Sequence, residues 1–133
     1  MRVNNKIDFL ARTVWGEARG EGAPGMAAVA AVVMNRVVSP RYPDTVQGVV
    51  LQDWQFSVWN IADPNRLKVL AVSDSDPDFR QALAIAADAV NGRLPDPTGG
   101  ATHYHTVNIN PYWRDDSKRT VTIGNHIFYA GIA

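Results

Sequence analysis

The fold is organised around the stretch Ala11-Arg12-Thr13-Val14-Trp15-Gly16-Glu17-Ala18-Arg19-Gly20-Glu21. The chain contains only two glutamates against eleven aspartates, and both glutamates lie in this stretch, four positions apart. Upstream, Ile7, Leu10 and Val14 follow helical spacing, which predicts an amphipathic helix from about residue 5 to the Trp15-Gly16 pair. Gly16 is expected to loosen or end that helix.

Glu17 follows this predicted helix directly and lies beside Trp15 in the sequence. A carboxylate on a rigid support in partly apolar surroundings has a raised pKa, which suits it to donate a proton near neutral pH. Glu17 is therefore the candidate general acid. The alternative interpretation is that Glu17 and Glu21 form a solvated helix end, paired with Arg12 or Arg19.

Length and composition restrict the class of protein. A chain of 133 residues predicts a single domain, residues 1–133, that is large enough to bury its own core. A formal net charge of zero, without a cluster of basic residues, argues against nucleic acid as a partner. The absence of cysteine excludes disulfides and thiolate chemistry.

The first residues lack the apolar core and the small-residue cleavage site of a signal peptide. The most apolar run, residues 26–34, is too short to cross a bilayer, which takes about 20 residues. We therefore expect no membrane insertion and a core helix in this run.

The predicted helices come first in the chain. A nearly all-apolar helix should run from Pro24, in its first turn, to Val38, and should be enclosed as the central helix. Asp44 or Thr45 should cap a short helix that ends at Leu51. Residues 52–59 alternate apolar and polar side chains and are expected to be extended. A polar loop, residues 73–77, ends with a capping residue and a proline, Asp76-Pro77, and a further helix should follow over residues 79–91.

The last third of the chain predicts a small antiparallel sheet. Residues 101–105 are typical of a strand, and residues 108–118 of a long excursion that carries Tyr112 and Trp113. Gly124-Asn125 separates two further strand-like runs, residues 120–123 and 126–129, and is a two-residue hairpin signal. The fold class is therefore α+β, with helices first and a sheet near the C-terminus.

Three histidines, His103, His105 and His126, raise the question of a zinc site, because His103 and His105 fall on one face of a strand. The sequence contains no HExxH motif and no cysteine pair, and a histidine beside aromatic residues in a strand more often donates a hydrogen bond or stacks. We assign no metal ligand and no cofactor.

Aromatic residues at loop-like positions suggest a groove that stacks on sugar rings, although some of them should belong to the core. The set comprises Trp15, Trp54, Trp59, Tyr104, Tyr112 and Trp113. Ser57 has no Gly-x-Ser-x-Gly context, so a nucleophile elbow is not indicated. The candidate groove residues are Gln55, Ser57, Trp59, Tyr104, Trp113 and His126. Glu21 either binds substrate or anchors a loop.

Several motifs in fixed order resemble the cell-wall hydrolase family of spore cortex-lytic enzymes (SleB type). The similarity covers nearly the whole chain, and its most specific part is the Gly-Glu-Ala-Arg-Gly-Glu run at residues 16–21. The other segments are Ala27–Asn35-Arg36-Val37, Pro43-Asp44-Thr45-Val46, Gln55-Phe56-Ser57, Asp96-Pro97-Thr98-Gly99-Gly100-Ala101 and Ile123-Gly124-Asn125-His126-Ile127-Phe128-Tyr129.

This resemblance implies a lysozyme-like fold and cleavage of peptidoglycan glycan strands between N-acetylmuramic acid and N-acetylglucosamine. It also implies that the first glutamate of the motif, Glu17, is the catalytic acid. Members from spore-formers often carry a signal peptide and a wall-binding domain. Because neither is recognised here, we expect a monomeric, phage-type endolysin that is made in the cytoplasm and reaches the wall by holin-type or particle-mediated release.

Two other functions stay open at this stage: a zinc-dependent amidase that uses the histidines, and a non-catalytic peptidoglycan-binding module. For a glycosidase, hydrolysis by two carboxyl groups requires a second acid across the substrate. Glu21 is expected on the same helix-end loop as Glu17 and is therefore poorly placed for that role. Asp53, Asp115 and Asp116 remain alternatives, but no motif singles out any of them. We therefore expect lytic transglycosylation with Glu17 as acid and then base.

Overall fold

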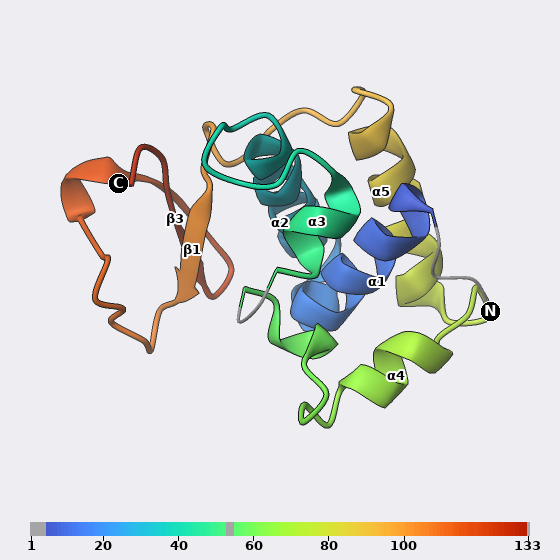
Figure 1. Ribbon diagram of the computed structural model, residues 1–133. Helices are drawn as coiled ribbons and strands as arrows, with labels where there is room; N and C mark the ends of the chain where they lie inside the picture. Colours follow the sequence, from blue (N-terminus) through green and yellow to red (C-terminus); the bar gives the residue numbers. More distant parts are fainter. Residues whose placement is uncertain (1–4, 53–54, 133) are drawn as a thin grey trace.

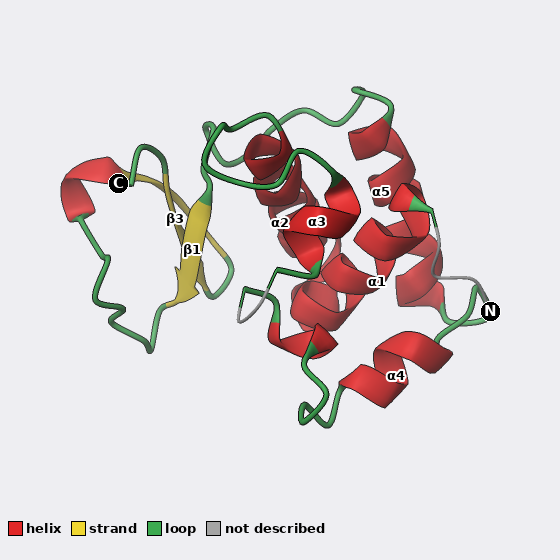
Figure 2. Cartoon of the chain, in the orientation of Figure 1, coloured by secondary structure: helices red, strands yellow, loops and turns green. Residues whose placement is uncertain are grey.

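The computed structural model describes residues 5–52 and 55–132. Helices lie on one side of the molecule and a small sheet lies on the other (Figure 1, and by secondary structure in Figure 2). The helices are α1 (Lys6–Ala18), α2 (Gly22–Val37), α3 (Val46–Val50), α4 (Arg66–Ala71) and α5 (Pro77–Val90). Three 3-10 turns, η1 (Arg19–Glu21), η2 (Ser57–Trp59) and η3 (Asp116–Lys118), and the strands β1 (His103–Thr106), β2 (Arg119–Ile123) and β3 (His126–Tyr129) complete the order. The α+β prediction is confirmed.

Helix α2 is the central helix, as its composition predicts. Met26, Val29 and Val33 are fully buried in the core shared with α1, α3 and α5. Ala28 and Val32, on another side of the same helix, are fully buried against residues of the sheet. A helix that is apolar all round must be covered all round, and α2 is covered by helices and by the sheet. None of the helices in the described residues is long and apolar enough to cross a membrane.

The predicted helix starts are confirmed by their caps. The Thr45 side chain accepts a hydrogen bond from the backbone N–H of Gly48 and so begins α3. The Asp76 side chain accepts from the backbone N–H of Phe79, and Pro77 follows at the first helical position of α5. These caps satisfy backbone donors that have no partner inside a helix.

The sheet has the order β1-β3-β2, with both pairs antiparallel. Gly124 and Asn125 connect β2 to β3, and Gly124 has a positive φ of 57°, which a tight hairpin turn of this kind requires. The central strand β3 is buried on both faces: Phe128 packs with Ala28 and Val32 of α2, whereas Tyr129 packs with Trp113 of the long loop. Trp113 therefore covers part of the face of β3 that is opposite α2.

Gly16 was expected to loosen or end the first helix, and it does not end it. Helix α1 continues to Ala18, so Gly16 lies inside it. A Cβ atom added at Gly16 would lie 2.9 Å from the Cγ1 of Val58 and 2.9 Å from the Cγ2 of Val69. The missing side chain therefore lets α1 approach η2 and α4 closely.

Two further expectations need correction. Residues 57–59 are not extended but form η2, in which Val58 is buried; residues 53–54, with Trp54, lie outside the described part of the chain. Helix α4 was not predicted, because it has only six residues, one buried side chain (Val69) and no side-chain cap. So short a helix leaves no hydrophobic periodicity in the sequence.

The packing of Gly16 predicts that Gly16→Ala destabilises the protein although alanine favours helices. Val58 and Val69 are 2% and 0% exposed, so neither can move aside freely. Overpacking typically costs about 1–3 kcal/mol and helix propensity returns at most about 1 kcal/mol, so we expect a net loss of roughly 1–2 kcal/mol in urea unfolding. Gly20→Ala is the matched control, because an added Cβ there meets nothing within 4 Å. Equal stability of the two variants would contradict the packing role of Gly16.

Candidate active site

Glu17 lies in the last turn of α1, where the helical part of the molecule faces β1. Its Oε1 atom accepts a hydrogen bond of 3.1 Å from the hydroxyl of Tyr104, which lies 87 positions later in the chain. Tyr104 belongs to β1 and stacks on Phe128 of β3, with ring centroids 5.5 Å apart. The acid and its hydrogen-bond donor are therefore each held by regular structure.

Burial raises the pKa of Glu17 from its ordinary value of 4.5 to about 7. The hydrogen bond from Tyr104 acts in the opposite direction, because it stabilises the ionised carboxylate, and the negative charge of Asp63 raises the pKa further. The pKa of Tyr104 is itself well above its ordinary value, through burial and the nearby Glu17 carboxylate. Tyr104 therefore stays protonated and acts as the donor.

The sequence interpretation of Glu17 attributed its apolar surroundings to Trp15, which is wrong. The Trp15 ring meets Phe79 of α5 edge-on at 6.5 Å, and its Nε1 donates to Asp76 at 3.4 Å. The indole therefore faces α5 and does not line the cleft around Glu17. The raised pKa was predicted correctly, but from the wrong neighbour.

A cleft of about 560 Å³ opens between the helical part and the sheet with its long loop. Its lining residues are Glu17, Arg36, Tyr42, Gln55, His103, Tyr104, His105, Thr106, Ile109, Pro111, Tyr112 and Trp113. Within the described part of the chain, Glu17 is the one carboxylate that lines this cleft. An acid with a pKa near 7 in such a cleft can give a proton to a bound substrate and take one back.

Arg36 is a residue of the cleft that the sequence reasoning missed as functional. Its Nε donates to the carbonyl oxygen of Thr102 at 2.8 Å, and its NH1 donates to Oε1 of Gln55 at 3.2 Å. The guanidinium also lies over the rings of Tyr42 and Phe56, at 4.9 and 5.4 Å from their centroids. Arg36 thus joins the end of α2 to the residues that lead into β1, and it is only 5% exposed. A charged residue in an otherwise apolar helix was the available signal.

The structure brings four of the predicted site residues into the cleft: Glu17, Gln55, Tyr104 and Trp113. Ser57 is exposed in η2 and does not line it. Trp59 lines a separate pocket, together with Asp63. The Nε1 atom of Trp59 donates a hydrogen bond of 2.9 Å to Oγ1 of Thr13.

Glu21 and His126 contact each other instead of the cleft. Oε2 of Glu21 lies 2.5 Å from Nδ1 of His126, and the two atoms are not aligned as a hydrogen bond. Oε1 of Glu21 accepts a hydrogen bond from the backbone N–H of Asn125. A Cβ on Gly124 would lie 2.6 Å from the same oxygen, so the turn approaches Glu21 as closely as glycine permits. Glu21 anchors the β2–β3 hairpin to the start of α2.

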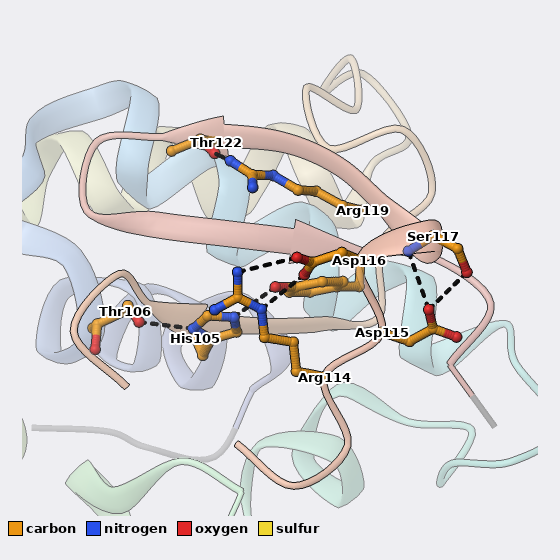
Figure 3. A network of polar contacts seen from close by, with 9 residues as sticks. His105, Thr106, Arg114, Asp115, Asp116, Ser117, Arg119 and Thr122 are labelled. Atoms are coloured by element: carbon orange, nitrogen blue, oxygen red, sulfur yellow. Dashed lines mark hydrogen bonds and ion pairs between the residues drawn. The ribbon is translucent and has the colours of Figure 1, made fainter. Parts of the chain in front are cut away.

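Two aspartates that were alternatives for a second catalytic acid are engaged elsewhere (Figure 3). Asp116 pairs with Arg114 at 2.7 Å, and Asp115 accepts hydrogen bonds from the backbone N–H and the hydroxyl of Ser117 at 3.1 and 2.6 Å. These contacts hold the pKa of each carboxyl below its ordinary value. Neither lines the cleft, and Asp53 lies outside the described residues.

The histidine side chains near the cleft are held by protein neighbours. Nδ1 of His105 donates a hydrogen bond of 2.7 Å to the carbonyl oxygen of Thr106 (Figure 3). Nε2 of His105 and the hydroxyl of Tyr129 share a hydrogen bond of 2.7 Å. Burial, with the charges of Arg36 and Arg41, lowers the pKa of His103 to about 4. In the described residues, no three His, Cys, Asp or Glu side chains form a group that could hold a metal ion.

A helical domain that carries a small antiparallel sheet, with one partly buried acid in the cleft between them, defines a lysozyme-like domain. The chain belongs to the Cell Wall Hydrolase family, whose model matches residues 20–129. That match begins three residues after Glu17, so the role of Glu17 rests on its place in the cleft and on its raised pKa.

Curated relatives and solved structures agree with this membership. The spore cortex-lytic enzymes of Halalkalibacterium halodurans and Bacillus subtilis are 40% and 37% identical to the chain; each alignment covers 94% of the chain, but 34% and 37% of the relative. The chain therefore spans about a third of the length of these relatives. The catalytic domain of the germination-specific lytic transglycosylase SleB from Bacillus anthracis is 32% identical, with a TM-score of 0.76 and 97% of both chains covered. The catalytic domain of Bacillus cereus SleB has a TM-score of 0.75 at 32% identity, with 98% of this chain and 93% of that chain covered.

The two neighbours that shift the pKa of Glu17 in opposite directions give a paired prediction. A general acid works in its protonated form, so activity should fall as the pH rises through the pKa of about 7. Tyr104→Phe removes the hydrogen bond that lowers this pKa, so the alkaline limb of kcat/KM should move to higher pH. Asp63→Asn removes the charge that raises it, so the limb should move to lower pH. Shifts in the same direction, or none, would contradict Glu17 as the titrating group.

Proposed function

We propose that this chain cleaves peptidoglycan glycan strands between N-acetylmuramic acid and N-acetylglucosamine, as a lytic transglycosylase that uses Glu17 as its acid and base. The observation that carries the proposal is the single carboxylate, with a pKa near 7, among the described residues that line the cleft. Support also comes from the similarity of the chain, over 97% of its length, to a catalytic domain described as a lytic transglycosylase.

The reaction uses one acid twice. Protonated Glu17 gives its proton to the glycosidic oxygen while the bond from that oxygen to the muramoyl anomeric carbon breaks, and the N-acetylglucosamine side leaves as an alcohol. The carboxylate then takes the proton of the muramoyl 6-hydroxyl, whose oxygen forms a bond to the same anomeric carbon. The muramoyl residue becomes a 1,6-anhydro sugar and Glu17 is protonated again. The reaction needs no second carboxylate and consumes no water, whereas glycoside hydrolysis needs both.

Tyr104 has a defined part in this scheme. Between the two proton transfers, Glu17 is ionised in a partly buried position, where a carboxylate is costly without hydrogen bonds. The hydroxyl of Tyr104, 3.1 Å from Oε1 of Glu17, stabilises that form. Hydrogen bonds that strengthen as charge develops lower the barrier more than uniform binding does.

Three other expectations stay predictions. They are the monomeric state, synthesis in the cytoplasm, and a phage-type context with holin-type or particle-mediated release. None of them is needed for the chemistry at Glu17.

Glu17→Gln is expected to abolish lysis of purified cell walls, because the amide keeps the shape of the side chain and cannot transfer the proton. A positioned acid or base typically contributes about 10²–10⁴ in rate, so the loss should reach at least this range. Glu21→Gln makes the same chemical change four positions away and should reduce the free energy of unfolding without abolishing lysis. Turbidity loss of walls and circular dichroism measure the two effects. Undiminished lysis by Glu17→Gln would remove Glu17 from the mechanism.

The released fragments identify the reaction. We expect mass spectrometry of digested peptidoglycan to find ends of 1,6-anhydromuramic acid, one water lighter than hydrolysis products and without a reducing end. Reducing muramic acid ends alone would mean hydrolysis and would make Asp63, which lies near enough to raise the pKa of Glu17, the candidate for positioning water. Free stem peptides with intact glycan strands would indicate the zinc-dependent amidase instead. Binding to the wall without any fragment would indicate a non-catalytic module.

A further inference from the structure

The loop after β1 exposes an unusual amount of apolar surface. Seven large hydrophobic residues are exposed in the described part of the chain, and three of them, Val107, Ile109 and Tyr112, lie within six positions of each other. Their exposed fractions are 45%, 56% and 100%. Single exposed apolar residues are common on proteins, whereas a group of them usually marks a binding surface.

This apolar surface is continuous with the cleft that contains Glu17. Ile109, Pro111 and Tyr112 all line the cleft, and so does the next residue, Trp113. These residues therefore form one rim of the cleft. The loop that carries them connects β1 to η3, on the side of the molecule where the sheet lies (Figure 1). A polymer that lies in the cleft with one bond at Glu17 must cross this rim or the opposite one.

The loop presents the Tyr112 ring from an anchored backbone. The N–H of Val107 donates to the carbonyl oxygen of Asn125 at 2.9 Å, and the N–H of Arg114 donates to that of Pro111 at 3.1 Å, which closes a turn around Tyr112. The Trp113 ring meets the rings of His103 and Tyr129 edge-on, at 4.9 and 5.3 Å. The backbone of Tyr112 is therefore fixed, and binding of a ligand to its ring orders only the side-chain torsions.

We propose that Tyr112 is a stacking platform for a sugar ring of the glycan strand, at a position beyond the two sugars joined at the scissile bond. This inference rests on the proposed function and extends it to the length of strand that the enzyme recognises. A pyranose ring offers a face of C–H groups that packs on an aromatic ring, and the phenol hydroxyl can stay in water. Arg114, Asp115 and Asp116, which follow directly and are charged, disfavour insertion of this loop into a bilayer.

The test compares glycan strands, stripped of their peptides, of two lengths: a long strand and the shortest oligosaccharide that the wild-type protein cleaves. Tyr112→Ala should raise KM for the long strand about tenfold, the size expected for loss of one aromatic contact, and leave kcat unchanged. KM for the shortest oligosaccharide should not change, because it does not reach Tyr112. Tyr112→Phe keeps the ring and should behave as wild type. Leu67→Ala is the matched control, since Leu67 is 73% exposed on α4 and does not line the cleft.

Three results would overturn this inference. The first is an unchanged KM of Tyr112→Ala for the long strand, and the second is an equal rise for both lengths. The third is a rise that occurs only with strands that still carry peptides, which would make Tyr112 a peptide contact. The failure of wild-type protein to cleave any strand would instead overturn the proposed function, so the two failures are distinguishable. Since Tyr112 is fully exposed, its replacement should leave the unfolding temperature unchanged, which circular dichroism verifies.

Discussion

The attachment of the sheet to helix α2 is the constraint on which the rest of the structure depends. At the middle of the helix, Ala28 and Val32 pack against Ala101 and Phe128, and all four are fully buried. Before the start of the helix, Glu21 holds the turn of the β2–β3 hairpin. Near its end, the side chains of Asn35 and Arg36 donate to the carbonyl oxygens of Ala101 and Thr102. One helix thus fixes the sheet at three places, and this fixes the distance between Glu17 and Tyr104.

The electrostatics of Glu17 follow from this arrangement. A carboxyl group at a helix end on the surface would have an ordinary pKa, and burial is what raises the pKa of Glu17 toward neutrality. Strand β1 supplies Tyr104, whose hydrogen bond limits the rise. The pKa of Glu17 is therefore set by two opposing effects, burial and one hydrogen bond. The balance leaves an acid that is protonated and deprotonated with comparable ease near pH 7.

Elements with strong local signals could be predicted from the sequence. The apolar run of α2, the Asp76-Pro77 start of α5 and the Gly124-Asn125 turn each carry their own pattern, and all three occur in the structure. Gly16 could not be interpreted correctly, because its role depends on Val58 and Val69, which come from distant segments. Helix α4 left no pattern for the same reason, since tertiary packing of a single residue stabilises it.

The residues of the site likewise fall into those that the sequence indicates and those that only the tertiary structure reveals. Glu17 was indicated by its motif and by the scarcity of glutamate, whereas Asp63 and Arg36 act through proximity that no spacing reveals. His126 was expected near the substrate, and Glu21 either there or as the anchor of a loop; the two contact each other from positions more than one hundred residues apart, and Glu21 holds the β2–β3 turn. Residue type suggests which groups are chemically capable, and the tertiary contacts decide which of them are free to react.

The small packing interface between α2 and the sheet also determines which part of this protein unfolds locally. Four fully buried residues, the partly buried Tyr104, Val121 and Ile123, and a few polar contacts join the sheet to the helices, whereas α1, α2, α3 and α5 share a much larger core. Local opening free energies follow such differences in buried contact, so the sheet is the part that detaches first. A molecule in that partly opened state keeps its helices but separates Tyr104 from Glu17. Loss of protection from amide hydrogen exchange in β1 and β3 should therefore accompany the loss of activity more closely than loss of protection in the helices does.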